Sequence, residues 1–140
     1  MKIRFLDSSV FLHAYLKPRR ELTPRELAIK SAAKEIIERV ESGEPVVTTV
    51  VHVSEVANIV EARVGLAKSI GLVSRLLVLS NVDILGVSAE DYEKAVSVAQ
   101  EYGVGVNDAV AYVKMREEGI REIYTFDKHF KNLPGIVILP

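Results

Sequence analysis

Ile3-Arg4-Phe5-Leu6-Asp7-Ser8-Ser9-Val10-Phe11 is the stretch of the sequence that decides the fold. Its first four residues have the apolar character of a short strand, and the apolar spacing that begins at Val10 predicts a helix. Asp7 separates these two elements. Ligands bind at the carboxyl ends of strands in open α/β sheets, so this position makes Asp7 a candidate site residue. Asp is also a favoured helix N-cap, which would explain the residue without a site.

Strands and helices alternate along the rest of the chain. We expect further strands over residues 46–49, 82–87, 122–126 and 136–139, and helices over 24–42, 51–64, 66–80, 88–103 and 106–118. Two capping boxes, Thr23 with Glu26 and Ser88 with Asp91, predict where two of these helices begin. The alternation favours an α/β fold with a parallel sheet covered by helices on both faces, and residues 1–140 are expected to form a single domain.

The composition restricts the class of protein. Of the 140 residues, 49% are hydrophobic and none is cysteine, so we expect a buried core without disulfides or thiolate metal sites. The early charges and the lack of a long apolar stretch predict no signal peptide and no membrane span, and we expect a cytoplasmic protein. The net charge of -1 argues against nucleic-acid binding through a strongly basic surface. A local basic rim stays open, since the following residues are either ordinary surface charges or phosphate contacts: Lys17, Arg19, Arg20, Lys128 and Lys131.

Two further acids occupy positions at the ends of predicted elements. Asp127 directly follows the strand 122–126, so we expect it at the same edge of the sheet as Asp7. Asp108 lies in the first turn of the helix 106–118, where an acid also interacts favourably with the helix dipole. The apolar face that we expect this helix to bury consists of Val106, Ala109, Val110 and Val113. Asp108 lies outside that face.

Glu55 is the fourth acid. It lies on the helix 51–64, opposite an apolar stripe that we expect to be buried, which consists of Val53, Val56, Ala57, Val60 and Val64. Val51 and Ile59 lie one turn away on either side of Glu55, so the carboxylate is expected to be half enclosed by apolar side chains. An ionised group in such a place needs a partner, because an unpaired buried charge is very costly. A semi-exposed Glu beside an oligomer contact is the alternative explanation.

Four clustered carboxylates predict a site for a hard divalent cation. All-oxygen ligation favours Mg²⁺ or Mn²⁺, and the mutual repulsion of the acids is relieved when such an ion binds. Zinc is not expected, because the chain has no cysteine and its histidines lack ligand-pair spacing. We interpret His13 as a boundary residue of its helix and His52 as a surface residue, whereas His129, beside Asp127, is placed to touch substrate.

Four short motifs resemble those of the PIN-domain nucleases, and in size and motif the chain is similar to the VapC-type toxins of toxin–antitoxin modules. The motifs are Phe5-Leu6-Asp7-Ser8-Ser9-Val10, Val53-Ser54-Glu55-Val56, Val106-Asn107-Asp108-Ala109 and Thr125-Phe126-Asp127-Lys128-His129-Phe130. The resemblance covers nearly the whole chain. It implies a PIN-like fold, with a central parallel sheet in the order 3-2-1-4-5 and an active site near the carboxyl ends of strands 1 and 4.

The resemblance also implies residue roles and partners. The catalytic and metal-binding acids would be Asp7, Glu55, Asp108 and Asp127, and the residues beside the metal or the substrate would be Ser9, Asn107, Thr125, Lys128 and His129. The activity would be hydrolysis of RNA phosphodiester bonds by a water activated on Mg²⁺ or Mn²⁺. Toxins of this type are covered by a small antitoxin and often form homodimers.

The helix expected over residues 66–80 is a candidate for the homodimer contact. Its apolar residues, which are Leu66, Ile70, Val73, Leu76, Leu77 and Leu79, predict either a dimer contact or plain burial within one domain.

Three other functions stay open at this stage. An RNA-maturation nuclease would share the same chemistry, and a non-catalytic RNA-binding or scaffold domain would share the fold without binding divalent metal. A phospho-accepting receiver domain has a similar length, but it needs an Asp after the third strand, where this chain has Gly86-Val87-Ser88.

Overall fold

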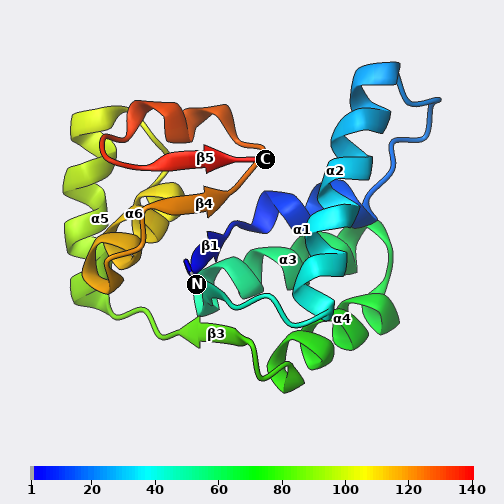
Figure 1. The fold of residues 1–140 in the computed structure, drawn as a ribbon, viewed down its shortest axis with the longest axis horizontal. Coiled ribbons are helices and arrows are strands. Elements are labelled where there is room, and N and C mark those ends of the chain that lie inside the picture. Colours follow the sequence, from blue (N-terminus) through cyan, green and yellow to red (C-terminus); the bar gives the residue numbers. More distant parts are fainter. Residues whose placement is uncertain (1) are drawn as a thin grey trace.

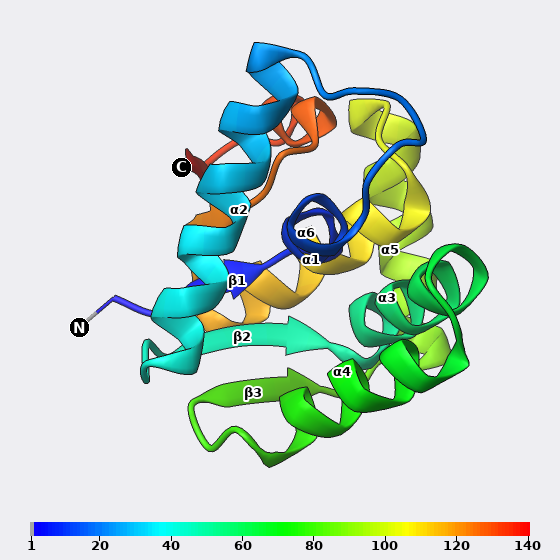
Figure 2. The same ribbon diagram turned by 90° about the vertical axis from the view of Figure 1, so that its right-hand side faces the viewer.

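The computed structural model describes residues 2–140, which form a five-stranded sheet in the order β3-β2-β1-β4-β5. All strand pairs are parallel. The strand order and the α/β class predicted from the sequence are therefore confirmed. The arrows of β1, β2 and β3 point the same way in Figure 2, so their carboxyl ends meet at one edge of the sheet.

The central strand is β1 (Arg4–Leu6), which pairs with β2 (Val46–Thr49) on one side and with β4 (Glu122–Tyr124) on the other. The outer strands are β3 (Val82–Leu85) and β5 (Val137–Leu139). The helices are α1 (Ser8–Tyr15), α2 (Pro24–Glu41), α3 (Val50–Arg63), α4 (Leu66–Val78), α5 (Ala89–Tyr102) and α6 (Val106–Glu118), and the short 3₁₀ helix is η1 (Lys128–Asn132).

The sheet separates two apolar cores. Because strand side chains alternate between faces, Phe5 of β1 packs with α5 and α6, whereas Leu6 packs with α1, α2 and α3. The neighbouring strand β2 repeats this alternation, with Val47 in the first core and Val46 in the second. Figure 1 shows the resulting layers, with α5 and α6 on one side of the sheet and α1 to α4 on the other.

The predicted helix starts agree with the structure. Both capping boxes form, at Thr23 for α2 and at Ser88 for α5. The predicted ends are less accurate, because the strand expected over 82–87 ends at Leu85 and the strand over 122–126 ends at Tyr124.

Two residues expected in the core lie at helix ends and are exposed. Val64 is the C-cap of α3, so it falls outside the helical repeat that would have turned it inward, and it is 48% exposed. Val106 begins α6 and lines an open cleft instead of the core. Neither residue belongs to the buried stripe of its helix, and both expectations were wrong.

Membrane spans are not found in the described part of the chain, since none of its helices combines sufficient length with sufficient hydropathy.

A buried lysine holds the end of α1 against α2. The ammonium of Lys30 on α2 donates hydrogen bonds to the carbonyl oxygens of His13, Ala14 and Leu16, at 3.2, 3.0 and 3.1 Å. These carbonyls belong to the last turn of α1 and its C-cap, which have no partner within the helix. Lys30 therefore stabilises α1, the helix that begins next to Asp7.

Replacing Lys30 with Met should lower the free energy of unfolding by roughly 1–3 kcal/mol, because buried carbonyls lose their donor while the side-chain volume is kept. Urea denaturation would measure this change. The matched control is Lys34→Met on the exposed side of the same helix, which should change stability little. Equal effects of the two substitutions would contradict the assigned role.

Candidate active site

The four predicted acids come from four separate elements at the carboxyl edge of the sheet. Asp7 follows β1 and occupies the N-cap position of α1, and Asp127 is the third residue after β4 and caps η1. Glu55 lies on α3, which directly follows β2, and Asp108 lies in the first turn of α6. Because β1 and β4 are neighbours, the sheet brings the first and last of these segments together.

Asp7 is buried at the base of the site, with 3% of its surface exposed. Its Oδ2 accepts hydrogen bonds from Ser9 Oγ and from Thr125 Oγ1, both at 2.7 Å. Its side chain makes no capping bond to α1, so helix capping does not explain this acid. The hydroxyls of Ser9 and Thr125, which the sequence placed beside the site, hold one carboxylate oxygen in a defined orientation.

The same two hydroxyls connect Asp7 to the segment that carries Asp127. The backbone N–H of Phe126 donates to Ser9 Oγ at 3.0 Å, and the backbone N–H of Asp127 donates to Thr125 Oγ1 at 3.0 Å. These bonds bridge the end of β4 to the start of α1. The distance between the two acidic segments is therefore set by backbone contacts as well as by side chains.

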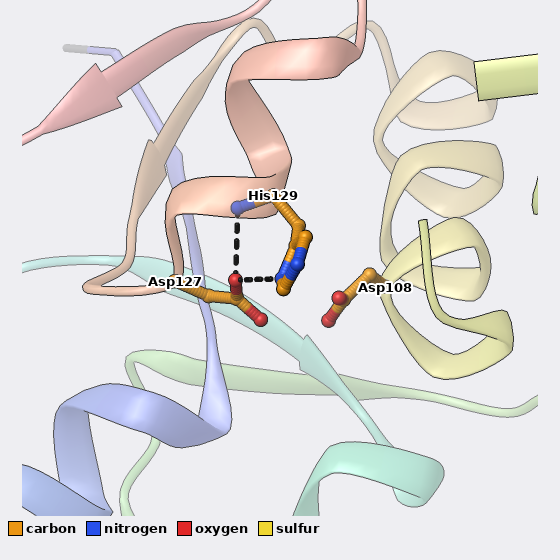
Figure 3. Close-up of side chains that lie close together, drawn as sticks. All are labelled: Asp108, Asp127 and His129. Carbon is orange, nitrogen blue, oxygen red and sulfur yellow. Dashed lines mark hydrogen bonds and ion pairs between the residues drawn. The ribbon is translucent and has the colours of Figure 1, made fainter. Parts of the chain in front are cut away.

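Asp108, Asp127 and His129 approach one another most closely. One ligand atom from each lies within 4.8 Å of the others, and Figure 3 shows the two carboxylates pointing toward each other. Asp127 Oδ1 accepts from the backbone N–H of His129 at 2.9 Å and lies 2.8 Å from its Nδ1. His129, expected beside the metal or the substrate, is thus close enough to the acids to act as a further ligand.

Crowding of these acids changes their proton affinity. Burial, followed by the carboxylates of Asp127 and Asp7, raises the pKa of Asp108 to about 7. Burial also acts to raise the pKa of Asp127, but the hydrogen bonds from the backbone and ring of His129 outweigh it, so this pKa is lowered. In the absence of a cation, the site resists full ionisation at Asp108.

Glu55 lines the same cleft as Asp108 and Asp127. Its carboxylate accepts from Ser8 Oγ at 3.2 Å and from Asn107 Nδ2 at 3.4 Å. Asn107, also predicted near the site, accepts in turn from the hydroxyl of Tyr92 at 3.1 Å. An open cleft of about 420 Å³ is lined by Glu55, Gly105, Val106, Asn107, Asp108 and Asp127.

Within residues 2–140, none of the four carboxylates has a Lys or Arg nitrogen within 4 Å. Among the basic side chains of these residues, only histidines come within 4 Å of the carboxylates: His52 at Asp7 and His129 at Asp127. Oxygen donors that lack a cationic partner fit a divalent cation such as Mg²⁺ or Mn²⁺.

The basic residues that the sequence offered as phosphate contacts lie in different parts of the structure. Lys128 and Lys131 are exposed on η1, next to Asp127. Arg20 instead forms a bidentate ion pair with Glu26, at 2.7 and 2.8 Å. Lys17 lines a separate cavity beside α1 and α2.

His52 was misassigned as a surface residue. It is 1% exposed, and its Nε2 lies 3.8 Å from Asp7 Oδ1. Burial lowers its pKa, and the nearby carboxylates of Asp7 and Glu55 only partly oppose this effect. Its spacing of four residues from Val56 and of eight from Val60, both buried, was the sequence signal that would have placed it on the inner face of α3.

Replacing Asp108 with Asn should raise the melting temperature of the metal-free protein by several degrees at about pH 8. The raised pKa means that the folded state binds this proton more tightly than the unfolded chain, so the stabilisation is complete below about pH 4 and is lost as the pH rises through about 7. Asn carries no charge and avoids this loss. The difference in melting temperature should therefore widen with pH, as followed by differential scanning fluorimetry in EDTA.

Asp83→Asn, which removes an exposed carboxylate on β3, is the matched control and should leave the melting temperature unchanged. A difference for Asp108→Asn that stays constant from acid to alkaline pH would contradict the assigned proton affinity.

Solved structures with a similar fold include several toxins and toxin–antitoxin complexes. The chain matches the Mycobacterium tuberculosis protein VapC20, described as a sarcin–ricin loop cleaving toxin, with a TM-score of 0.73 and 22% identity over 99% of this chain and 100% of that one. It matches a toxin–antitoxin complex from Klebsiella pneumoniae with a TM-score of 0.62 and 19% identity, over 98% and 96%. It matches DNA-bound VapBC from Salmonella typhimurium with a TM-score of 0.65 and 17% identity, over 99% and 98%.

At these identities the similarity concerns the fold. Among curated proteins there is no significant match. The sequence model described as PIN domain matches residues 4–136, which include all four acids and every strand but the last. The chain therefore belongs to the PIN domain family.

Proposed function

We propose that this protein is a metal-dependent ribonuclease and the toxin of a toxin–antitoxin module. One observation carries the proposal: Glu55, Asp108 and Asp127 line one cleft, the buried Asp7 lies close enough to raise the pKa of Asp108, and none of these four carboxylates has a Lys or Arg partner in the described chain. A fold that gathers like charges in this way is stable only if the charge is neutralised by protons or by bound cations. Phosphodiester hydrolysis is the reaction that such a cation site supports.

In the proposed mechanism, Asp7 and Asp108 are the principal holders of Mg²⁺ or Mn²⁺. A bound divalent cation would supply an activated water and neutralise charge on the scissile phosphate. Ser9 and Thr125 orient Asp7 through its Oδ2, and Asp127 lies close enough to Asp108 to share the same cation. Glu55, held by Ser8 and Asn107, adds a further carboxylate to the lining of the cleft.

The proton on Asp108 competes with binding of a divalent cation at the site. Since its pKa is raised to about 7 by burial and by neighbouring acids, part of the site is protonated near neutral pH when no cation is present. Cation binding must displace this proton, so affinity should increase with pH. The protein contributes the clustered carboxylates, whose mutual repulsion makes the exchange of this proton for a divalent cation favourable.

RNA is the proposed substrate. The related VapC20 is described as cleaving the sarcin–ricin loop, which supports a nuclease of the same kind here. The exposed Lys128 and Lys131 on η1 lie beside Asp127, where a phosphate backbone entering the cleft would meet them. An RNA-maturation nuclease would use the same residues, and its substrate would distinguish it from a toxin.

An antitoxin and a second copy of the chain are the proposed protein partners. The Klebsiella pneumoniae structure contains a toxin together with an antitoxin, which supports the first. For the second, α4 leaves apolar side chains exposed: Ile70 is 57% exposed and Leu77 is 66% exposed, whereas Leu76 packs into the core. Isolated chains rarely leave such a stripe in water, so we assign it to a homodimer contact.

The nuclease proposal is tested by cleavage of a structured RNA pool with Mg²⁺, with Mn²⁺ and with EDTA. We expect cleavage only with metal, and Asp7→Asn and Asp108→Asn should each reduce it by more than about 100-fold, since substitutions outside the ligand shell already cost up to that factor. Asp83→Asn is the control and should cleave normally. Full activity in both site variants would refute the assignment, and absence of metal binding would favour the non-catalytic binding domain.

The dimer proposal predicts a two-fold larger mass at micromolar concentration in sedimentation equilibrium. Replacing Ile70 and Leu77 together with Lys should yield monomers, because two charges in an apolar contact are strongly unfavourable. Val96→Lys on α5, which is also exposed, should leave the mass unchanged. Monomeric wild-type protein at that concentration would exclude the α4 contact.

A further inference from the structure

The ring of His52 lies against Asp7 but is not a ligand in the cleft. It occupies the first turn of α3, and its edge meets the ring of Phe5 at 5.1 Å between centroids and 79° between planes. Its Nδ1 lies 2.7 Å from Thr49 Oγ1. Its Nε2 is the only buried side-chain polar atom of the described residues without a hydrogen-bond partner, and it faces Asp7 Oδ1 at 3.8 Å.

Thr49 determines which ring nitrogen carries the hydrogen. Its hydroxyl is fully buried and accepts from the backbone N–H groups of Val51 and His52, at 3.1 and 3.2 Å. A hydroxyl has two acceptor positions and one proton. Both acceptor positions are thus occupied, and the proton is left to donate to His52 Nδ1.

This count excludes the other forms of the ring. If His52 carried a hydrogen on Nδ1, alone or together with one on Nε2, Thr49 Oγ1 would face three donors and its own proton would have no acceptor. The neutral ring with its hydrogen on Nε2 satisfies both the Thr49 hydroxyl and Nδ1. The hydrogen on Nε2 has no hydrogen-bond acceptor, and Asp7 Oδ1 lies 3.8 Å from that nitrogen.

The two oxygens of Asp7 consequently have different surroundings. Oδ2 is saturated by the hydroxyls of Ser9 and Thr125. Oδ1 accepts no hydrogen bond from the described residues, and His52 Nε2 lies 3.8 Å from it, a distance that exceeds a hydrogen bond by about half an ångström. A small movement of the carboxylate would close this gap.

We propose that His52 is a positioning residue for Asp7: Thr49 holds the ring with its hydrogen on Nε2, and this N–H orients Oδ1 for divalent cation binding. The proposal rests on the proposed function, in which Asp7 binds the cation. His52 acts through Asp7 and does not itself contact the cation or the RNA. Donors behind a ligating carboxylate typically change metal affinity by about 10–100-fold.

The test compares the Mn²⁺ affinity of purified full-length variants by electron paramagnetic resonance. His52→Leu fills the buried space without a donor and should weaken Mn²⁺ binding by about 10–100-fold. His52→Gln carries an amide N–H at the distance of Nε2 and should recover most of the affinity. Val56→Ala, a loss of buried volume one turn further along α3, should lower the melting temperature in EDTA but leave the affinity unchanged.

Long-range ¹H–¹⁵N spectra of the metal-free wild-type protein test the tautomer without any substitution. The hydrogen should be found on Nε2, and finding it on Nδ1 would overturn the proposal even if His52→Leu failed to fold. Wild-type Mn²⁺ affinity in His52→Leu would overturn the positioning role while leaving the proposed nuclease intact. Failure of the wild-type protein to bind Mn²⁺ would overturn the proposed function and the positioning role together.

Discussion

Pairing of β1 with strands on both sides is the constraint on which the rest of the structure depends. The strand has only three residues, yet Phe5 is in register with Val47 of β2 and with Ile123 of β4. This double pairing brings together three chain segments that are about 40 and 75 residues apart. Asp7 leaves the sheet between β2 and β4, so the segments that follow these two strands and carry Glu55 and Asp127 begin on either side of it.

The site concentrates negative charge at the edge that this pairing creates. The rise in the pKa of Asp108 to about 7 is the consequence, since burial and the three neighbouring carboxylates of Asp127, Asp7 and Glu55 all disfavour its ionised form. The surrounding elements tolerate this cost because both apolar cores lie beneath the site and β1 contributes to each. The clustered acids therefore lower the stability of the folded protein when Asp108 is ionised and its charge is not neutralised.

Hydroxyl groups organise the carboxylates that the sheet brings together. Ser9 and Thr125 bind the same oxygen of Asp7 and also accept backbone N–H groups from the segment leading to Asp127. Thr49 combines two similar tasks, since it caps α3 and contacts the ring of His52. Each of these hydroxyls bonds both to a backbone N–H group and to an ionisable side chain, so it fixes the orientation of that side chain relative to the backbone. This explains why small polar residues surround the acids.

Local sequence determined the main elements of this protein: apolar period and capping boxes predicted each α-helix and each strand to within a few residues. The four acids were selected from their positions at strand ends and on helices, whereas the strand order and the acids' roles followed from the resemblance of short motifs; the order is confirmed by the structure. The tertiary structure alone decided which side chains meet. His52 and Asp7 are 45 residues apart, and their contact depends on the pairing of β1 with β2. The exposure of Val64 and Val106 likewise depends on where the packed elements end. Periodicity describes one helix at a time, whereas burial and proton affinity depend on the neighbours that long-range packing supplies.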